Sequence, residues 1–205
     1  YEIWKYIDDL DYNNFLYIKF KNKEIDDATW MKLIIKRYKE KDVQREYLHE
    51  ISKKLELLPG SYETLEKLYK NGIKIFILSG GVKQIIEDVL KRENMGKFIA
   101  SIEGYDLIFD SLGKLIDYKS PSLHNPENKN EYIELIKKQY NLKNNEILFV
   151  GNASNDEKVY LSGVKTLCIN PDDANFSNKI IWNNAIENCE NLLEILPFCE
   201  LGKTK

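Results

Sequence analysis

The strongest indication of the fold lies in residues 73–81, which read IKIFILSGG. Residues 73–78 are almost entirely apolar, which is typical of a strand buried on both faces of a parallel sheet. Ser79, Gly80 and Gly81 follow at once and predict a turn from this strand into a helix. The stretch therefore predicts one strand–turn–helix unit of an α/β protein.

The same alternation of strand and helix extends on both sides of this stretch. A helix is expected from Ser61 to the stop signal Asn71-Gly72, and another starts at Asn125-Pro126, because proline fits the first helical position. The other expected elements are strands at 146–150 and 164–169, short strands with a turn at Ser111–Gly113 within 98–118, and helices from about 155 and at 191–196. Repeated β-α-β units predict a doubly wound, Rossmann-like parallel sheet that binds ligands at the carboxyl ends of its strands.

The N-terminal part of the chain has a different pattern. Residues 1 to about 55 have apolar groups at helical spacing, and Pro59-Gly60 then interrupts the chain. We therefore expect a small helical domain over residues 1–55 and an α/β core over residues 56–205.

Composition excludes several classes of protein. The net charge of −3 lacks the basic excess of a nucleic-acid-binding domain, and no apolar run is long enough for a membrane helix. Cys168, Cys189 and Cys199 form no CxxC pair, which favours reduced thiols. We expect a cytoplasmic, soluble protein with neither nucleic-acid nor membrane partners; the oligomeric state stays open.

Two segments at predicted strand ends contain groups that could take part in chemistry. Ser79, Gly80 and Gly81 offer a hydroxyl and backbone N–H groups to an anion, or they form a tight turn that merely needs glycine. Asn152, Asn155 and Asp156 offer oxygen ligands of the kind that Mg²⁺ prefers, or they cap the following helix. Lys129, taken alone, is an ordinary surface charge.

The order of these segments along the chain resembles the haloacid dehalogenase-like phosphatase superfamily, and within it the branch of the phosphoserine phosphatases. The resemblance implies that Ser79, Gly80, Gly81 and Asn155 bind the phosphoryl group. It implies that Lys129 neutralises the phosphoryl oxygens, and that Asn152 and Asp156 hold Mg²⁺. Residues 1–55 are similar to the family's helical cap. The implied activity is hydrolysis of a small phosphorylated metabolite through an aspartyl-phosphate.

Two features depart from the family pattern. The nucleophile of the family lies in an Asp-x-Asp-x-Thr motif on a first strand, and Asp9-Leu10-Asp11 has this spacing without the threonine. We therefore expect the nucleophile strand upstream of Tyr1 and an inactive chain as it stands. Asn152 replaces the usual acidic metal ligand, which lowers the expected metal affinity.

Two alternatives follow from these departures. The chain is a degenerate family member that binds or regulates rather than catalyses, or it is an unrelated doubly wound nucleotide-binding protein. The second alternative lacks a G-x-G-x-x-G or Walker-type run.

Overall fold

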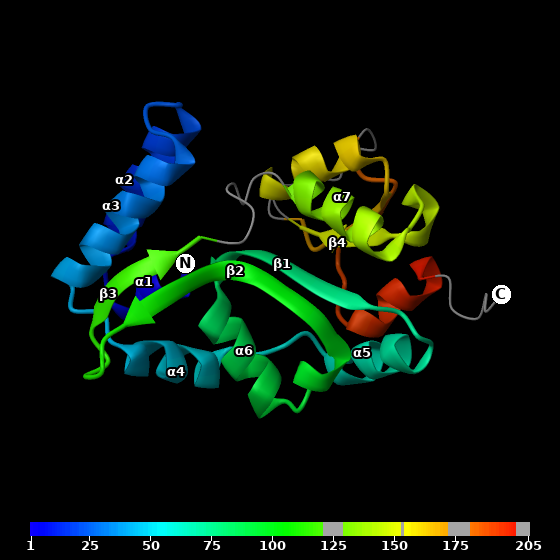
Figure 1. The fold of residues 1–205 in the computed structure, drawn as a ribbon, viewed down its shortest axis with the longest axis horizontal. Coiled ribbons are helices and arrows are strands. Elements are labelled where there is room, and N and C mark those ends of the chain that lie inside the picture. The colour runs from blue at the N-terminus through cyan, green and yellow to red at the C-terminus, as the bar shows by residue number, and fades with distance from the viewer. Residues whose placement is uncertain (121–128, 153, 172–180, 200–205) are drawn as a thin grey trace. The chain divides into compact units, whose positions relative to one another are not determined.

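The computed structural model describes residues 1–120, 129–152, 154–171 and 181–199 (Figure 1). The chain forms two compact units, whose boundary crosses the strands β1 and β2. Unit 1 comprises residues 1–56, 81–96 and 103–121, and unit 2 the remainder. The predicted cap, residues 1–55, lies within unit 1, and its role as a cap stays a prediction.

Unit 1 is mainly helical. Its helices are α1 (Glu2–Tyr6), α2 (Leu10–Lys21), α3 (Asp27–Glu40), α4 (Arg45–Lys54) and α6 (Lys83–Arg92). The apolar residues expected at helical spacing form its core together with side chains of β2 and β3, among them Trp4, Leu16, Ile35, Leu48, Tyr105 and Leu115. The helices α4 and α6 pack side by side, and Arg92 donates hydrogen bonds to the carbonyl oxygens of Ser52 and Leu55 where α4 ends.

Asp9 connects the start of α2 to α3 through an ion pair with Arg37. It is the N-cap residue of α2, and its carboxylate accepts hydrogen bonds from Arg37 Nε at 2.7 Å and Nη2 at 3.4 Å. The Arg37 guanidinium also lies over the Tyr12 ring. The hydrogen bond from Arg37 holds the pKa of Asp9 below its ordinary value. Asp9 is thus a structural residue at a helix start, and its partner is the guanidinium of Arg37.

The Asp9–Arg37 pair predicts a pH-dependent contribution to stability. The folded-state pKa of Asp9 is lowered from 3.8, so the pair stabilises the fold above that pH and is lost as the pH falls through the folded-state pKa. We expect Arg37→Met to be less stable than the wild type at neutral pH and the difference to shrink in acid. Urea unfolding at neutral and at acidic pH measures the difference in the free energy of unfolding between the variant and the wild type. Lys36→Met, which breaks the exposed Lys36–Glu40 pair, is the control. A difference that is the same at both pH values would contradict this assignment.

Unit 2 contains helices and the parallel strands, whereas β3 lies in unit 1 and β1 and β2 are shared between the units. Its elements are α5 (Ser61–Lys70), α7 (Lys129–Tyr140), the strands β4 (Leu148–Gly151), β5 (Lys165–Ile169) and β6 (Asn184–Ile186), and the 3₁₀ segments η2 (Asn144–Glu146), η3 (Ser154–Ser162) and η4 (Leu192–Phe198). One cluster of its core joins Ile133, Val159 and Val164, and the ring of Trp182 stacks on that of Phe149. Gly60, with φ of +73°, precedes α5 and abuts Asn191, which caps η4.

In the part of the chain that the structure describes, the strands form two three-stranded sheets rather than one. Figure 1 shows the strands β1, β2 and β3 of the first sheet. The first has the order β1 (Ile75–Val82), β2 (Ile99–Phe109) and β3 (Leu115–Lys119), and its β2–β3 pair is antiparallel. The second has the order β4-β5-β6 and is parallel, with Leu148 opposite Lys165. The α/β class and the parallel sheet are confirmed, but β1 and β4 each form the edge of a separate sheet among the described residues.

Several local expectations are confirmed. The helix at 61–70 and the strands around 146–150 and 164–169 are present, and residues 98–118 form a hairpin. Its turn at residues 111–113 is fixed by the Asp110 carboxylate, which accepts the backbone N–H groups of Leu112 and Lys114. The start of the helix at 125–126 lies outside the described residues.

Other expectations are wrong. Ser79, Gly80 and Gly81 do not form a turn but continue β1 to Val82, because both glycines avoid the left-handed region and the strand stays beside β2. The helices expected from residue 155 and at 191–196 are 3₁₀ segments, and the strand β6 had no clear signal.

Candidate functional site

The site centres on a buried ion pair at the carboxyl end of β4. Lys129 Nζ donates a hydrogen bond to Asp156 Oδ1, and only 9% and 4% of the two side chains are exposed. Lys129 is the first residue of α7, whereas Asp156 lies in η3, just beyond β4. The two residues come together because α7 and η3 pack on each other.

The surroundings of the pair complete its contacts. Asp156 Oδ2 accepts the backbone N–H of Asn152 at 3.0 Å, so both carboxylate oxygens hold hydrogen bonds. Lys129 Nζ also lies 6.0 Å from the centre of the Phe149 ring in β4, within the range of a cation–π contact. The sequence predicted Lys129 and Asp156 as site residues, and the structure brings these two together.

Lys129 is buried although it carries a charge. Burial of a cation has a desolvation cost that a partner of opposite charge offsets. The ammonium therefore depends on Asp156, and it provides positive charge at the sheet edge where ligands of α/β proteins bind.

Gly151 allows Asp156 to reach this position. A Cβ atom on Gly151 would lie 2.5 Å from Asp156 Oδ2 and 2.7 Å from Phe149 Cε1. A side chain at position 151 would therefore force the Asp156 carboxylate and the Phe149 ring to move. The resemblance predicted Gly151 as the first residue of the turn 151–156 that supplies metal ligands, and Phe149 was expected only within the buried strand at 146–150. The packing of both residues against Asp156 was not predicted.

This close contact predicts that Gly151→Ala disrupts the site. Overpacking of this kind costs about 1–3 kcal/mol, and here it displaces the Asp156 carboxylate. We expect a lower free energy of unfolding in urea and a shifted Lys129 ammonium signal in the NMR spectrum. Gly96→Ala is the matched control, because a Cβ there meets nothing within 4 Å. Equal stability of the two variants would contradict the packing argument.

The remaining predicted site residues are only partly placed. Ser79, half-buried, and Gly80, exposed, lie in β1 within unit 2, and Gly81 belongs to unit 1. Asn152 has an exposed side chain, and the Asn155 side chain lies outside what the structure describes. Convergence of Ser79 with the Lys129–Asp156 pair stays a prediction. His49 faces Asp88 on the surface at 3.5 Å.

The described residues do not by themselves fit a Mg²⁺ ion. Asp156 is the one predicted carboxylate ligand, and Lys129 occupies one of its oxygens. Asn152 brings no charge, and the described part of the chain contains no group of three or more His, Cys, Asp or Glu side chains placed to hold a metal. A magnesium ion at this place would need a further carboxylate or a displaced Lys129.

The fold is of the α/β class, and its site holds a buried Lys129–Asp156 ion pair at the carboxyl end of the parallel strand β4. The profile of the haloacid dehalogenase-like hydrolases matches residues 9–159, and the chain belongs to this family. No curated protein matches the sequence.

Solved structures agree in fold. A HAD family hydrolase from Salmonella enterica serovar Typhi matches with a TM-score of 0.80 at 16% identity, over 97% of this chain and 65% of that one. A probable phosphoserine phosphatase from Vibrio cholerae matches with a TM-score of 0.78 at 17% identity, over 98% of this chain and 58% of that one. A phosphoserine phosphatase solved as a phospho-aspartyl intermediate analogue matches with a TM-score of 0.76 at 19% identity, over 97% of this chain and 90% of that one. The chain thus spans less than two thirds of the first two relatives.

No helix in the described ranges combines the length and the apolar character that a membrane span requires.

Proposed function

We propose that the protein is a magnesium-dependent phosphomonoester hydrolase for a small phosphorylated metabolite and that it reacts through an aspartyl-phosphate. The observation that carries this proposal is the buried Lys129–Asp156 pair at the carboxyl end of β4. An ammonium group held in this way compensates the charge of phosphoryl oxygens in the transition state. Ser79 and the backbone N–H groups of Gly80 and Gly81 would bind the same phosphoryl group.

The nucleophile would come from a strand outside residues 1–205. The half-buried edges of β1 and β4 support this, because within the described ranges β1 has one strand neighbour, β2, and β4 has one, β5. Within unit 2, α7 contacts both sheets. Tyr140 lies 5.7 Å from Phe76 of β1, and Ile133 packs against Phe149 of β4. A strand between β1 and β4 would complete one sheet beneath α7.

The reaction would proceed in two steps. An aspartate carboxylate attacks phosphorus, the P–O bond to the metabolite breaks, and the leaving oxygen takes a proton from a neighbouring acid. Water then hydrolyses the acyl phosphate and releases inorganic phosphate. Lys129 and Ser79 act on the phosphoryl oxygens in both steps, and neither changes its covalent bonds.

The magnesium part of the proposal depends on carboxylates from the added strand. Both carboxylate oxygens of Asp156 already accept hydrogen bonds, one from Lys129 and one from the backbone N–H of Asn152. We therefore expect chain 1–205 to bind Mg²⁺ weakly and Asn152→Asp to bind it more tightly, since the exposed position 152 accepts a carboxylate. Calorimetric titration with MgCl₂ measures this. Gln139→Glu adds the same charge at an exposed site on α7 and serves as control. Equal affinities in all three proteins would contradict the assignment of position 152.

The function is tested by comparing chain 1–205 with the full-length product of its gene. Both are assayed with p-nitrophenyl phosphate and a panel of phosphorylated metabolites, with and without Mg²⁺. We expect turnover only in a product that contains an Asp-x-Asp strand, and trapping of its phosphorylated aspartate by mass spectrometry. Turnover by chain 1–205 that Asp9→Ala abolishes would refute the proposed nucleophile strand.

A binding or regulatory module is the second candidate. Asn152, which brings no charge, and Lys129, which occupies Asp156, favour it. A full-length product without an Asp-x-Asp strand, which binds orthophosphate but releases none from any substrate, would support this alternative.

A further inference from the structure

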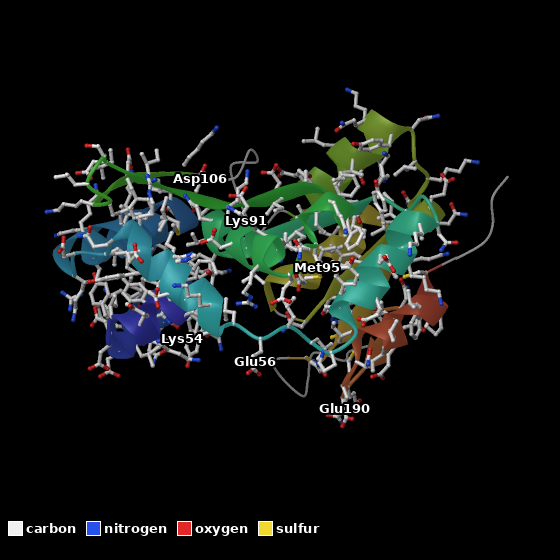
Figure 2. The ribbon with its side chains drawn as sticks, turned by 90° about the horizontal axis from the view of Figure 1, so that it is seen from below. Lys54, Glu56, Lys91, Met95, Asp106 and Glu190 are labelled. Atoms are coloured by element: carbon white, nitrogen blue, oxygen red, sulfur yellow. The ribbon has the colours of Figure 1, made fainter. Side chains whose placement is uncertain are left out.

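The side chain of Gln84, in the first turn of α6, hydrogen-bonds to the backbone of β2 as a neighbouring strand would. Gln84 Nε2 donates a hydrogen bond to the carbonyl oxygen of Leu107 at 2.6 Å, and Gln84 Oε1 accepts the N–H of Leu107 at 3.2 Å. Nε2 also donates to Asp106 Oδ1. Asp106 lies on β2, above α6 in the view of Figure 2. One amide thus satisfies both backbone groups of a β2 residue.

This contact lies where β1 ends. β1 runs to Val82, and α6 begins at Lys83, so beyond that point the backbone of β1 cannot pair with β2. The carbonyl oxygen of Gly81 lies close to Gly104 of β2, because a Cβ on Gly104 would meet it at 3.0 Å. The junction between β1 and α6 is therefore held on β2 at two neighbouring points, at Gly104 and at Leu107.

We propose that Gln84 is a positioning residue, which fixes Gly81 and the start of α6 so that the Ser79–Gly81 segment is preorganised for an anion. The use of this segment for phosphate rests on the proposed function, whereas the contact itself does not. A side-chain amide suits the task, because a single planar group offers an acceptor for N–H and a donor for C=O. The orientation of the amide is fixed, since only Oε1 can accept from Leu107 N–H.

The test is Gln84→Met, which keeps the length of the side chain and removes its hydrogen bonds. We expect amide hydrogen exchange at Gly81 and Leu107 to become about 10-fold faster, because a local contact is lost. Exchange at Leu167, in the core of the other sheet, should not change. Lys91→Met on an exposed position of α6 is the control (Figure 2).

A second pair of variants distinguishes the loss of these hydrogen bonds from a general folding defect. Q84E places a carboxylate against Asp106 and should accelerate exchange further, and Q84E/D106N restores a donor–acceptor pair and should slow it again. Exchange at Gly81 and Leu107 that matches the wild type in both Q84M and Q84E would overturn the proposal.

An orthophosphate titration of the same proteins separates this proposal from the proposed function. We expect Q84M to bind phosphate more weakly than the wild type, with Lys91→Met unchanged. Faster exchange in Q84M together with phosphate binding equal to the wild type would overturn the positioning role. If the full-length gene product binds no phosphate at all while exchange in Q84M rises, the proposed function fails and the contact of Gln84 with β2 is still supported.

Discussion

Asp156→Ala is expected to lower the free energy of unfolding by about 3–5 kcal/mol, because it leaves Lys129 as an unpaired buried cation. Both side chains are almost fully buried. The variant also removes the acceptor for the Asn152 N–H and opens space beside Gly151. Urea or thermal unfolding of chain 1–205 measures the loss, and no enzymatic activity is required.

Two further variants separate charge from packing. The double variant Lys129→Met/Asp156→Leu replaces the pair by apolar groups and should recover much of the lost stability, because no charge is left uncompensated. Glu66→Gln breaks the exposed Lys70–Glu66 pair and should cost less than about 1 kcal/mol. If Asp156→Ala were as stable as Glu66→Gln, the buried pair would not exist in solution.

The proposed function predicts that Lys129→Met lowers kcat of the gene product by about 10²–10³-fold, the usual effect of losing one preorganised group that stabilises transition-state charge. The substitution retains the apolar stem of the side chain but removes the ammonium partner of the buried Asp156 carboxylate, so the stability of the variant is measured as well. In the wild type the ammonium donates a hydrogen bond to Asp156 and also lies over the Phe149 ring. Steady-state kinetics with p-nitrophenyl phosphate give the value.

The control for this experiment is Lys137→Met on the same helix. Lys137 pairs with Glu134 across one turn of α7, and its ammonium also donates a hydrogen bond to the carbonyl oxygen of Ser162. The kcat of the Lys137→Met variant should match that of the wild type. A Lys129→Met enzyme with unchanged kcat, whose fold is verified by its unfolding curve, would remove Lys129 from the catalytic site.

The buried strands of unit 2 could be predicted from the sequence because the apolar runs at 146–150 and 164–169 have few alternatives. The hairpin at 98–118 was also predictable, since Asp110 and Gly113 provide the turn chemistry. Periodicity does not reveal which sheet a strand joins. The division into two sheets, with β1 and β4 at their edges, depends on long-range pairing.

The errors at Ser79–Gly81 and at η3 have local causes. Two successive glycines indicate a turn, but here they continue β1, and the missing side chain of Gly104 on β2 allows the Gly81 carbonyl oxygen to approach closely. The segment after Gly151 has a helical composition, yet the contacts of Asp156 with Lys129 and with the Asn152 N–H lie at its start, and it is a 3₁₀ segment rather than an α-helix. The role of Gln84 had no sequence signal, because a glutamine in a first helical turn is ordinary.

The most direct test of the site is a crystal structure of the full-length gene product with orthovanadate bound. The account predicts one oxyanion in contact with the Ser79 hydroxyl and the Lys129 ammonium, at the carboxyl end of β4. An oxyanion bound elsewhere, with Ser79 and Lys129 facing different sides of the molecule, would contradict it.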